Sequence, residues 1–253
     1  MKNIFFVHGM FQNPKSWNEW VKYFEAKGYK CHTPAYPYHE GEPAELRGNI
    51  PAELSKLTLD RVVDSVAQVI NKLDEEPIVI GHSMGGLITQ ILVNRGLAKA
   101  GICIDSAPPA GVFSFKWSFL KSNLPVINPF KGLSPCVLTK AQFHYAFCNV
   151  MSQADSDKVY DELVTPESRN IPRSVMKHGE IDFAKPHPPL LMIAGSDDNI
   201  IPQSLVESNF GKYSDKRSQT DLKVFPGRCH FICGQKGWEE VAGYIASWVE
   251  RLN

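Results

Sequence analysis

The sequence lacks an excess of either charge. Lys plus Arg and Asp plus Glu number 27 each among 253 residues, so the formal net charge is zero. Charges of both signs alternate along the chain, and no basic run stands out. This balance provides no long-range attraction to nucleic acid or to an anionic membrane, so we expect neither as a partner.

Long apolar runs are also missing. The apolar run at residues 4–7 is too short for the hydrophobic part of a signal peptide, and no stretch approaches the ~20 apolar residues of a membrane span. Internal repeats and low-complexity segments are absent as well. These absences favour a globular cytoplasmic protein.

The six cysteines form no C-x-x-C pair and no recurring spacing. Without a secretory signal they are expected to be reduced thiols. Cys229 and Cys233 flank His230, but no second His/Cys pair accompanies them, so packing is favoured over a metal site. A Cys136–Cys148 disulfide stays open. We expect neither a metal nor another cofactor.

What the sequence does contain is an alternation of strands and helices. Apolar runs predict strands at residues 3–7, 29–33, 77–80, 100–104, 188–194 and 222–225. One-sided apolar patterns predict helices at residues 14–27, 58–73 and 236–252 and after residue 83, whereas residues 36–56 are expected to form a loop. Near-continuous apolar strands separated by helices indicate an α/β fold, in which a parallel sheet is covered on both faces.

Residues 110–185 break this alternation. They hold several prolines, helical patterns near residues 140–151 and 156–163, and seven aromatic residues: Phe113, Phe115, Trp117, Phe119, Phe143, Tyr145 and Phe147. We predict a helical cap inserted into a core of residues 1–109 and 186–253.

The most informative motif is Gly81-His82-Ser83-Met84-Gly85, between a predicted strand and a predicted helix. A serine on so sharp a turn projects its hydroxyl from the sheet edge, and small flanking residues let strand and helix approach closely. Ser83 is therefore the expected nucleophile. His82 belongs to the turn and is expected to face away from the chemistry.

A serine nucleophile needs a base, and a base histidine needs an acid that orients it. His230 is the expected base because it follows the last predicted strand. Asp198 is the preferred acid because it follows the strand at residues 188–194, with Asp197 and Asp105 as the alternatives. Because parallel strands end at a common sheet edge, these residues are expected to share one site.

An oxyanion site needs two donors. The backbone amide of Met84, at a helix N-terminus, is the first candidate. The second is the amide of Met10, in the loop after the first strand, where Gly9 lets the backbone turn. His8 is expected to bond this loop rather than to take part in the chemistry.

Together these residues resemble the α/β-hydrolase superfamily, whose order Ser…Asp…His matches Ser83, Asp198 and His230. The resemblance spans the chain: residues 8–9 match the oxyanion loop, 81–86 the elbow, 195–202 the acid loop and 227–231 the histidine loop. It implies a helical lid where residues 110–185 fall. The first predicted strand begins almost at Met1, so we expect the two N-terminal strands of larger members to be missing and the sheet to be compact, with about six parallel strands, as in small esterases.

The resemblance implies a serine hydrolase, and a carboxylic-ester hydrolase is the preferred activity. The same triad serves cofactor-free haloperoxidases (perhydrolases), lactonases, thioesterases and hydroxynitrile lyases, which the sequence does not separate. A ligand receptor without turnover is the alternative of another class, disfavoured by the intact triad.

The expected partner is a small ester with an apolar group. Phe11, Ile200, Trp117 and Phe143 are the expected substrate contacts, the first two because they lie beside catalytic residues and the others because the predicted cap is aromatic.

Overall fold

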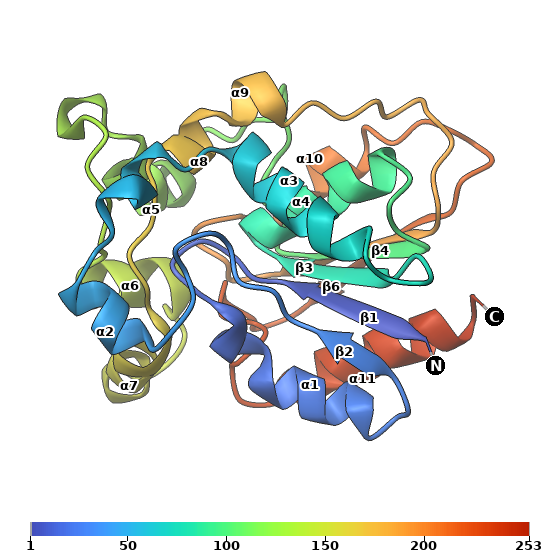
Figure 1. Ribbon diagram of the computed structural model, residues 1–253, viewed down its shortest axis with the longest axis horizontal. Helices are drawn as coiled ribbons and strands as arrows, with labels where there is room; N and C mark the ends of the chain where they lie inside the picture. The colour runs from blue at the N-terminus through green and yellow to red at the C-terminus, as the bar shows by residue number, and fades with distance from the viewer. Residues whose placement is uncertain (1, 253) are drawn as a thin grey trace.

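The computed structural model describes residues 2–252 and has three layers, a central sheet with helices on both faces (Figure 1). Within these residues the sheet has six parallel strands in the order β2-β1-β3-β4-β5-β6. The predicted compact parallel sheet of about six strands is confirmed. The strands are β1 (Asn3–Val7), β2 (Lys30–His32), β3 (Ile78–His82), β4 (Ala100–Ile104), β5 (Leu190–Gly195) and β6 (Thr220–Phe225).

The burial of the strands follows their composition. Every residue of β3, β4 and β5 is buried, as expected of apolar strands covered on both sides. The edge strand β6 is mostly half-buried and carries the polar residues Thr220, Asp221 and Lys223. The most buried strands, β3, β4 and β5, therefore lie in the interior of the sheet, away from the edge strands β2 and β6.

The direction of the chain across the sheet reverses between β1 and β3. The chain passes from β1 outward to β2, then returns to the other side of β1, where Val7 pairs in register with Gly81. Such a switch point opens a crevice at the carboxyl ends of the two strands, where ligands bind in open α/β sheets. The Met10 loop follows β1 there, and the Ser83 elbow follows β3.

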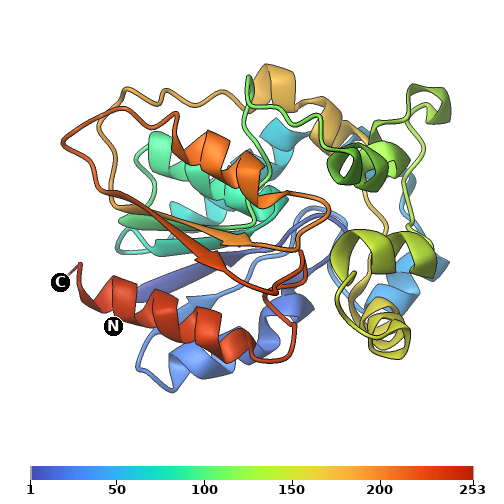
Figure 2. The ribbon, with the colours of Figure 1, turned by 180° about the vertical axis from the view of Figure 1, so that it is seen from behind.

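Helices cover the sheet on both faces (Figures 1 and 2). One face carries the short 3-10 helix η1 (Pro14–Trp17), α1 (Asn18–Glu25) and α11 (Trp238–Glu250), which bury Trp17, Trp20 and Trp248 against it. The other face carries α3 (Leu59–Ile70), α4 (Met84–Asn94) and α10 (Gln203–Phe210). The Asn13 side chain accepts a hydrogen bond from the Lys15 amide (3.1 Å) and so begins η1.

The segment between β4 and β5 is helical and lies beyond the carboxyl edge of the sheet. It contains α5 (Trp117–Ile127), η3 (Pro129–Lys131), α6 (Lys140–Phe147), α7 (Gln153–Leu163), α8 (Asn170–Arg173) and α9 (Val175–His178). We propose that residues 110–185 are a cap on a core formed by residues 1–109 and 186–253.

The prediction of a loop at residues 36–56 is wrong in part, because α2 (Pro43–Gly48) and η2 (Ala52–Lys56) lie within it. Helix α2 packs against α7, and Arg47 donates hydrogen bonds to the carbonyls of Tyr160, Asp161 and Val164. Pro43 occupies the first turn of α2, where its missing N–H costs nothing. Contacts with a distant helix thus stabilise a segment that has little helical pattern of its own.

No helix within residues 2–252 is long and apolar enough to cross a membrane. All six cysteines are free, including Cys136 and Cys148, so the structure does not contain the disulfide that the sequence left open.

Candidate active site

Ser83 lies at the turn between β3 and α4 in a conformation that only a tightly held residue adopts. Its φ of 56° and ψ of −120° place a non-glycine residue in a sparsely populated region of backbone space. The Ser83 amide donates to the Ile104 carbonyl (2.9 Å), and the Ser83 carbonyl accepts from the Ala107 amide (2.9 Å). The amide and the carbonyl of Ser83 are therefore tied to β4 and to the loop that follows it.

The glycines of the elbow are required by the close approach of strand and helix. A Cβ atom on Gly85 would lie 2.1 Å from the Val7 carbonyl oxygen, and one on Gly81 would lie 2.1 Å from the Gly85 carbonyl oxygen. Neither separation is sterically allowed, so any larger side chain would push α4 away from β1 and β3. The predicted steric need for small residues at both flanks is confirmed.

His230 and Asp198 form a direct pair. His230 Nδ1 lies 2.6 Å from Asp198 Oδ2, and both side chains are fully buried. The second carboxylate oxygen of Asp198 accepts from the amides of Ile200 (2.7 Å) and Ile201 (2.8 Å). Asp197, by contrast, is exposed, and its carboxylate accepts from the Ser196 hydroxyl (3.1 Å). The structure thus pairs Asp198, not Asp197, with His230.

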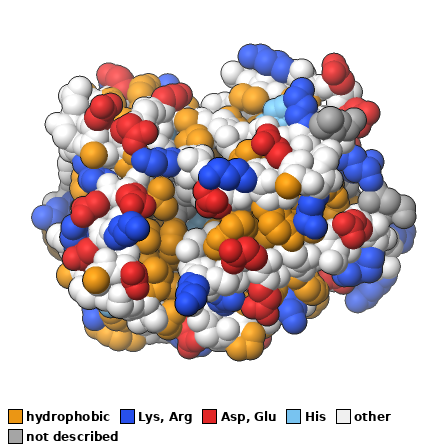
Figure 3. All heavy atoms as spheres, turned by 90° about the horizontal axis from the view of Figure 1, so that it is seen from below, with side chains coloured by type: hydrophobic (Ala, Val, Ile, Leu, Met, Phe, Trp, Pro, Cys, Tyr) orange, Lys and Arg blue, Asp and Glu red, His pale blue; other side chains and the backbone are white. Residues whose placement is uncertain are grey.

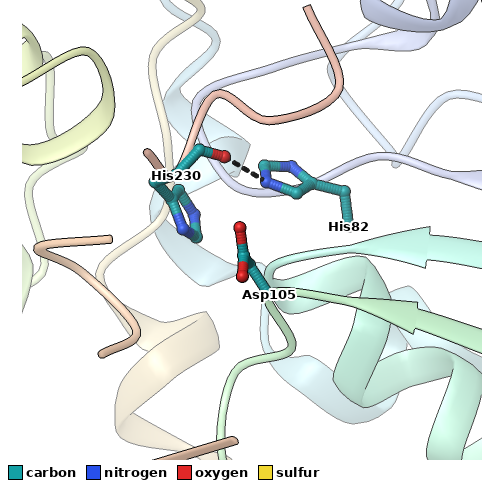
Figure 4. A group of neighbouring side chains, drawn as sticks. All are labelled: His82, Asp105 and His230. Carbon is teal, nitrogen blue, oxygen red and sulfur yellow. Dashed lines mark hydrogen bonds between the residues drawn. The ribbon is translucent and has the colours of Figure 1, made fainter. Parts of the chain in front are cut away.

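His230 is held beside the elbow by His82, the residue before Ser83. The two imidazole rings lie 4.7 Å apart between centroids, and His82 Nε2 makes a 2.8 Å hydrogen bond with the His230 carbonyl oxygen (Figure 4). The expectation that His82 faces away from the site is wrong. Within residues 2–252, His230 Nε2 is buried and has no hydrogen-bond partner. Its bond to Ser83 Oγ is thus not formed, as is common in sites without substrate, where catalytic bonds are long.

Asp105, the third aspartate considered from the sequence, is buried beside this pair. Its φ is 41°, and its Oδ1 accepts from the Gly195 amide (2.7 Å). In Figure 4 its carboxyl group points into the space between His82 and His230. Ligand atoms of these three residues lie within 4.8 Å of one another, and they are the one such His/Cys/Asp/Glu group in the described part of the chain.

Cys229 and Cys233, the cysteines that flank His230, do not join this group. Cys229 Sγ instead donates a weak hydrogen bond to Gln235 (3.4 Å), and Cys233 is buried among the apolar residues of the opposite face of the sheet. Both cysteines therefore pack beside the base, which is the interpretation that the sequence favoured.

Burial determines the protonation of the site. It lowers the pKa of His230 to about 3, so the imidazole is neutral and can accept a proton. Burial, together with the charge of Asp198, raises the pKa of Asp105 well above its usual range. Burial also raises the pKa of Asp198, while hydrogen bonds from the Ile201 and Ile200 amides oppose that shift. The charge of Asp198 therefore favours the protonated form of Asp105.

The loop after β1 and the start of α4 each bring a free amide to the serine. A Cβ atom on Gly9 would lie 2.9 Å from Ser83 Cβ, so this backbone touches the nucleophile. Within residues 2–252, the amides of Met10 and Met84 donate no hydrogen bond. The arrangement can bind a negatively charged oxygen beside Ser83.

Two residues that the sequence analysis did not single out, Thr165 and Glu167, hold the loop after β1 in place. Phe11 has a φ of 61°; its amide donates to Glu167 Oε2 (3.3 Å), and its carbonyl accepts from the Thr165 amide (3.0 Å). Glu167 is fully buried and lies 3.3 Å from His39 Nε2. The segment before α8 therefore holds the backbone next to Met10, a contact across more than 150 residues that no local pattern reveals.

His8 and Tyr36, which are both buried, also support the loop after β1. His8 Nδ1 bonds the Gly9 carbonyl (2.9 Å), and His8 Nε2 accepts from the Tyr36 amide (3.2 Å). Burial lowers the pKa of His8 to about 3, with a further contribution from His39. Burial also lowers the pKa of His39, but the charge of Glu167, whose Oε2 lies 3.3 Å from His39 Nε2, outweighs it and raises the pKa overall. His8 bonds the loop, as expected from the sequence.

A cavity of about 330 Å³ opens at Ser83. Met10, Phe11 and Met84 line it from the core, while residues of α5 and α9 line it from the other side. Its lining includes no charged residue, and Ser83, Ser122 and Asn123 are its polar side chains. The cavity can therefore accept an uncharged apolar group next to the serine hydroxyl.

Two of the four expected substrate contacts, Phe11 and Ile200, line this cavity. The other two do not. Trp117 is 73% exposed, and Phe143 is fully buried behind Phe147, on which its ring stacks at 4.8 Å. Among the seven aromatic residues noted between residues 110 and 185, those that line the cavity are Phe113, Phe119 and Phe147.

Comparison with known proteins gives a family and a fold. The sequence profile described as "Alpha/beta hydrolase family" matches residues 4–243. A search of curated proteins finds no match.

Solved structures with the same fold include three at low identity. The monoacylglycerol lipase of Paleococcus ferrophilus has 19% identity and a TM-score of 0.69, with 97% of this chain and 93% of that chain covered. An extracellular alpha/beta-hydrolase from a Paenibacillus species has 19% identity and a TM-score of 0.72, with 98% of each chain covered. Tomato methylketone synthase I, solved with 2-tridecanone, has 12% identity and a TM-score of 0.72, with 100% of this chain and 99% of that chain covered.

Proposed function

The chain belongs to the alpha/beta hydrolase family, and we propose that it is a carboxylic-ester hydrolase that works through a serine acyl-enzyme. One observation carries this proposal. Ser83 lies on a strained turn and lines an apolar cavity. A buried His230–Asp198 pair with a 2.6 Å contact packs against His82, the residue before Ser83.

The proposed reaction has two halves. Ser83 Oγ attacks the ester carbonyl carbon while His230 Nε2 accepts its proton, and the Met10 and Met84 amides bind the oxyanion. His230 then gives the proton to the departing alcohol, which leaves an acyl group on Ser83. His230 activates a water molecule that releases the acid and restores the serine. Asp198 holds the imidazole orientation and stabilises its charged form.

The cavity indicates the class of ester. With no charged side chain in its lining, it favours an uncharged apolar acyl or alkyl group over a charged one. The tomato methylketone synthase with the same fold was solved with 2-tridecanone, a long apolar chain. We therefore propose an apolar small-molecule ester as the substrate and keep a cytoplasmic location as a prediction.

A fluorophosphonate probe tests the nucleophile. We expect one covalent adduct, mapped by mass spectrometry to the peptide that contains Ser83. Ser83→Ala should abolish it, and His230→Ala should slow it strongly because the base is lost. No adduct on folded protein would refute the assignment of Ser83.

A series of p-nitrophenyl esters of rising acyl length tests the substrate class. We expect kcat/KM to increase from acetate to medium-length acyl chains, because each added methylene buries apolar surface in the cavity. Activity on acetate alone would contradict the apolar acyl site. Saturable binding of an ester without turnover would instead favour the receptor alternative.

A further inference from the structure

One segment of the molecule exposes apolar side chains to an unusual degree. Twelve large hydrophobic side chains are exposed in the described residues, and nine of them lie between residues 113 and 137. Phe115 and Phe130 are 90% and 94% exposed, and Trp117 is 73% exposed. We call residues 113–137 the exposed segment. Exposed hydrophobic side chains that are scattered singly are ordinary, whereas a concentration of them of this kind marks a protein or membrane interaction site.

The charge of this segment is of one sign. Acidic residues number 27 in 253, about one in nine, yet none occurs between Asp105 and Asp155. The same stretch contains Lys116, Lys121, Lys131 and Lys140. Within residues 2–252, Lys140 pairs with Asp161, whereas the other three lysines form no ion pair. The zero net charge of the whole chain hides this local excess.

The face drawn in Figure 3 has a different charge pattern. The face drawn in Figure 3 carries Lys or Arg and Asp or Glu side chains interspersed over its whole width. The loop that follows α5 projects from the end of the molecule in both ribbon views, away from the chain termini (Figures 1 and 2). Arg173 of α8 donates hydrogen bonds to the carbonyls of Gly132 (2.5 Å) and Asn128 (2.6 Å), so a further cation supports that loop.

The exposed segment is continuous with the mouth of the cavity. Phe113 and Ile127 are exposed and also line the cavity that contains Ser83, as does Met176 of α9. A molecule that leaves an apolar phase at this surface can therefore enter the cavity without its apolar part crossing water.

We propose that the exposed segment binds the surface of an anionic phospholipid membrane. Its aromatic side chains enter the boundary between headgroups and acyl chains, and Lys116, Lys121 and Lys131 meet the negative headgroups. This inference goes beyond the proposed hydrolysis and does not depend on it. It runs against the expectation of no membrane partner, which rested on the zero net charge and on the lack of a basic run in the chain.

The charges favour lipid over a second copy of the chain. In a two-fold symmetric dimer the same patch faces itself, so lysines from the two copies would approach one another with no acidic residue of the segment to separate them. An anionic surface supplies the opposite charge for all of them.

Vesicle flotation tests the proposal. The Ser83→Ala protein, which cannot consume lipid, is mixed with phosphatidylcholine vesicles with or without phosphatidylserine. We expect flotation with the anionic vesicles and a blue shift of the emission of Trp117, the one tryptophan of five that is exposed. Trp117→Phe should remove the shift.

Matched variants identify the segment. Phe115→Ser/Phe130→Ser should lower the vesicle partition coefficient by roughly tenfold or more, because two large apolar side chains no longer leave water. Val150→Ser, at an exposed apolar residue outside the segment, is the control and should bind normally. Lys116→Gln/Lys131→Gln should lower binding to anionic vesicles by roughly tenfold and leave neutral vesicles unaffected. Thermal melts establish that each variant is folded.

Absence of flotation, or flotation that the Phe115/Phe130 variant leaves unchanged, would overturn the proposal. A dimer in light scattering that the same variant dissociates, without vesicle binding, would show that a second copy covers the segment. Hydrolysis of a soluble p-nitrophenyl ester is measured separately, so loss of the proposed enzymatic function and loss of membrane binding are distinguishable.

Discussion

The carboxyl edge of the sheet buries polar side chains, whereas the exposed segment leaves apolar side chains in contact with water. At the sheet edge the polar groups of His230, Asp198 and Asp105 are buried, and strands and loop amides fix their positions. In the exposed segment, aromatic side chains such as Phe115 and Phe130 point into water. The difference separates two tasks. The sheet edge holds the groups of the proposed hydrolysis in fixed positions, whereas residues 113–137 offer the exposed surface for the proposed membrane contact.

The largest expected effect concerns the acid of the triad. Asp198→Asn should lower kcat by roughly 10⁴-fold, because an amide cannot hold the histidine in the reactive tautomer. Asp197→Asn, at the exposed neighbour, is the matched control and should be almost unaffected. Steady-state kinetics on a soluble ester provide the measurement.

Asp105→Asn sharpens this prediction. Because the pKa of Asp105 is raised, its neutral amide replacement resembles the protonated carboxyl group and can still accept from the Gly195 amide, so kcat/KM should change by less than about tenfold. Equal losses for the Asp198 and Asp197 variants, or a loss confined to Asp105→Asn, would show that the acid is misassigned.

A smaller effect is expected at Glu167, whose backbone pairs with Cys136 of the exposed segment and whose side chain holds the loop after β1. Glu167→Gln should reduce kcat by roughly tenfold with little change in KM, because Glu167 accepts from the Phe11 amide beside the proposed oxyanion donor Met10. Glu162→Gln, at an exposed residue of α7, is the control. A rise in KM at constant kcat would instead indicate that Glu167 shapes the substrate cavity.

A substitution in the cavity should have an effect of similar size on kcat/KM. Val126 of α5 is buried and lines the cavity. Val126→Phe should lower kcat/KM for a long acyl ester by roughly tenfold relative to acetate, because the larger ring fills space that the chain needs. Leu133→Phe, in the exposed segment away from the cavity lining, should leave the ratio unchanged. An unchanged ratio in Val126→Phe would mean that the acyl chain binds elsewhere.

The smallest effect concerns pH. Because burial lowers the pKa of His230 to about 3, the acidic limb of kcat/KM should lie below pH 6.5, the ordinary value for histidine. A limb at or above pH 6.5 would contradict the buried neutral base.

The sheet could be predicted from the sequence because its signals are local. The strands at residues 3–7 and 100–104 were predicted with the bounds that β1 and β4 have, since each is an apolar run between polar or turn-forming neighbours. The elbow was equally readable, because Gly81 and Gly85 record a close approach of adjacent elements. His230 and Asp198 could be selected by their places after strands.

The rest depends on contacts between distant parts of the chain. Helix α5 was not predicted, since Pro125 interrupts its pattern and many of its apolar residues face outward. Trp117 and Phe143 have similar apolar side chains, yet one is exposed and the other fully buried, a difference that only tertiary packing determines. His82 was misjudged because its partner, the His230 carbonyl, lies 148 residues away.

The crowding around Gly85 makes the activity of this protein sensitive to small changes in its structure. With the Val7 carbonyl pressed against the helix that starts at the nucleophile, a small separation of β1 from α4 displaces the serine before the secondary structure changes. Turnover should therefore disappear at lower denaturant concentration than the helical circular dichroism signal, which makes activity the more sensitive gauge of an intact sheet centre.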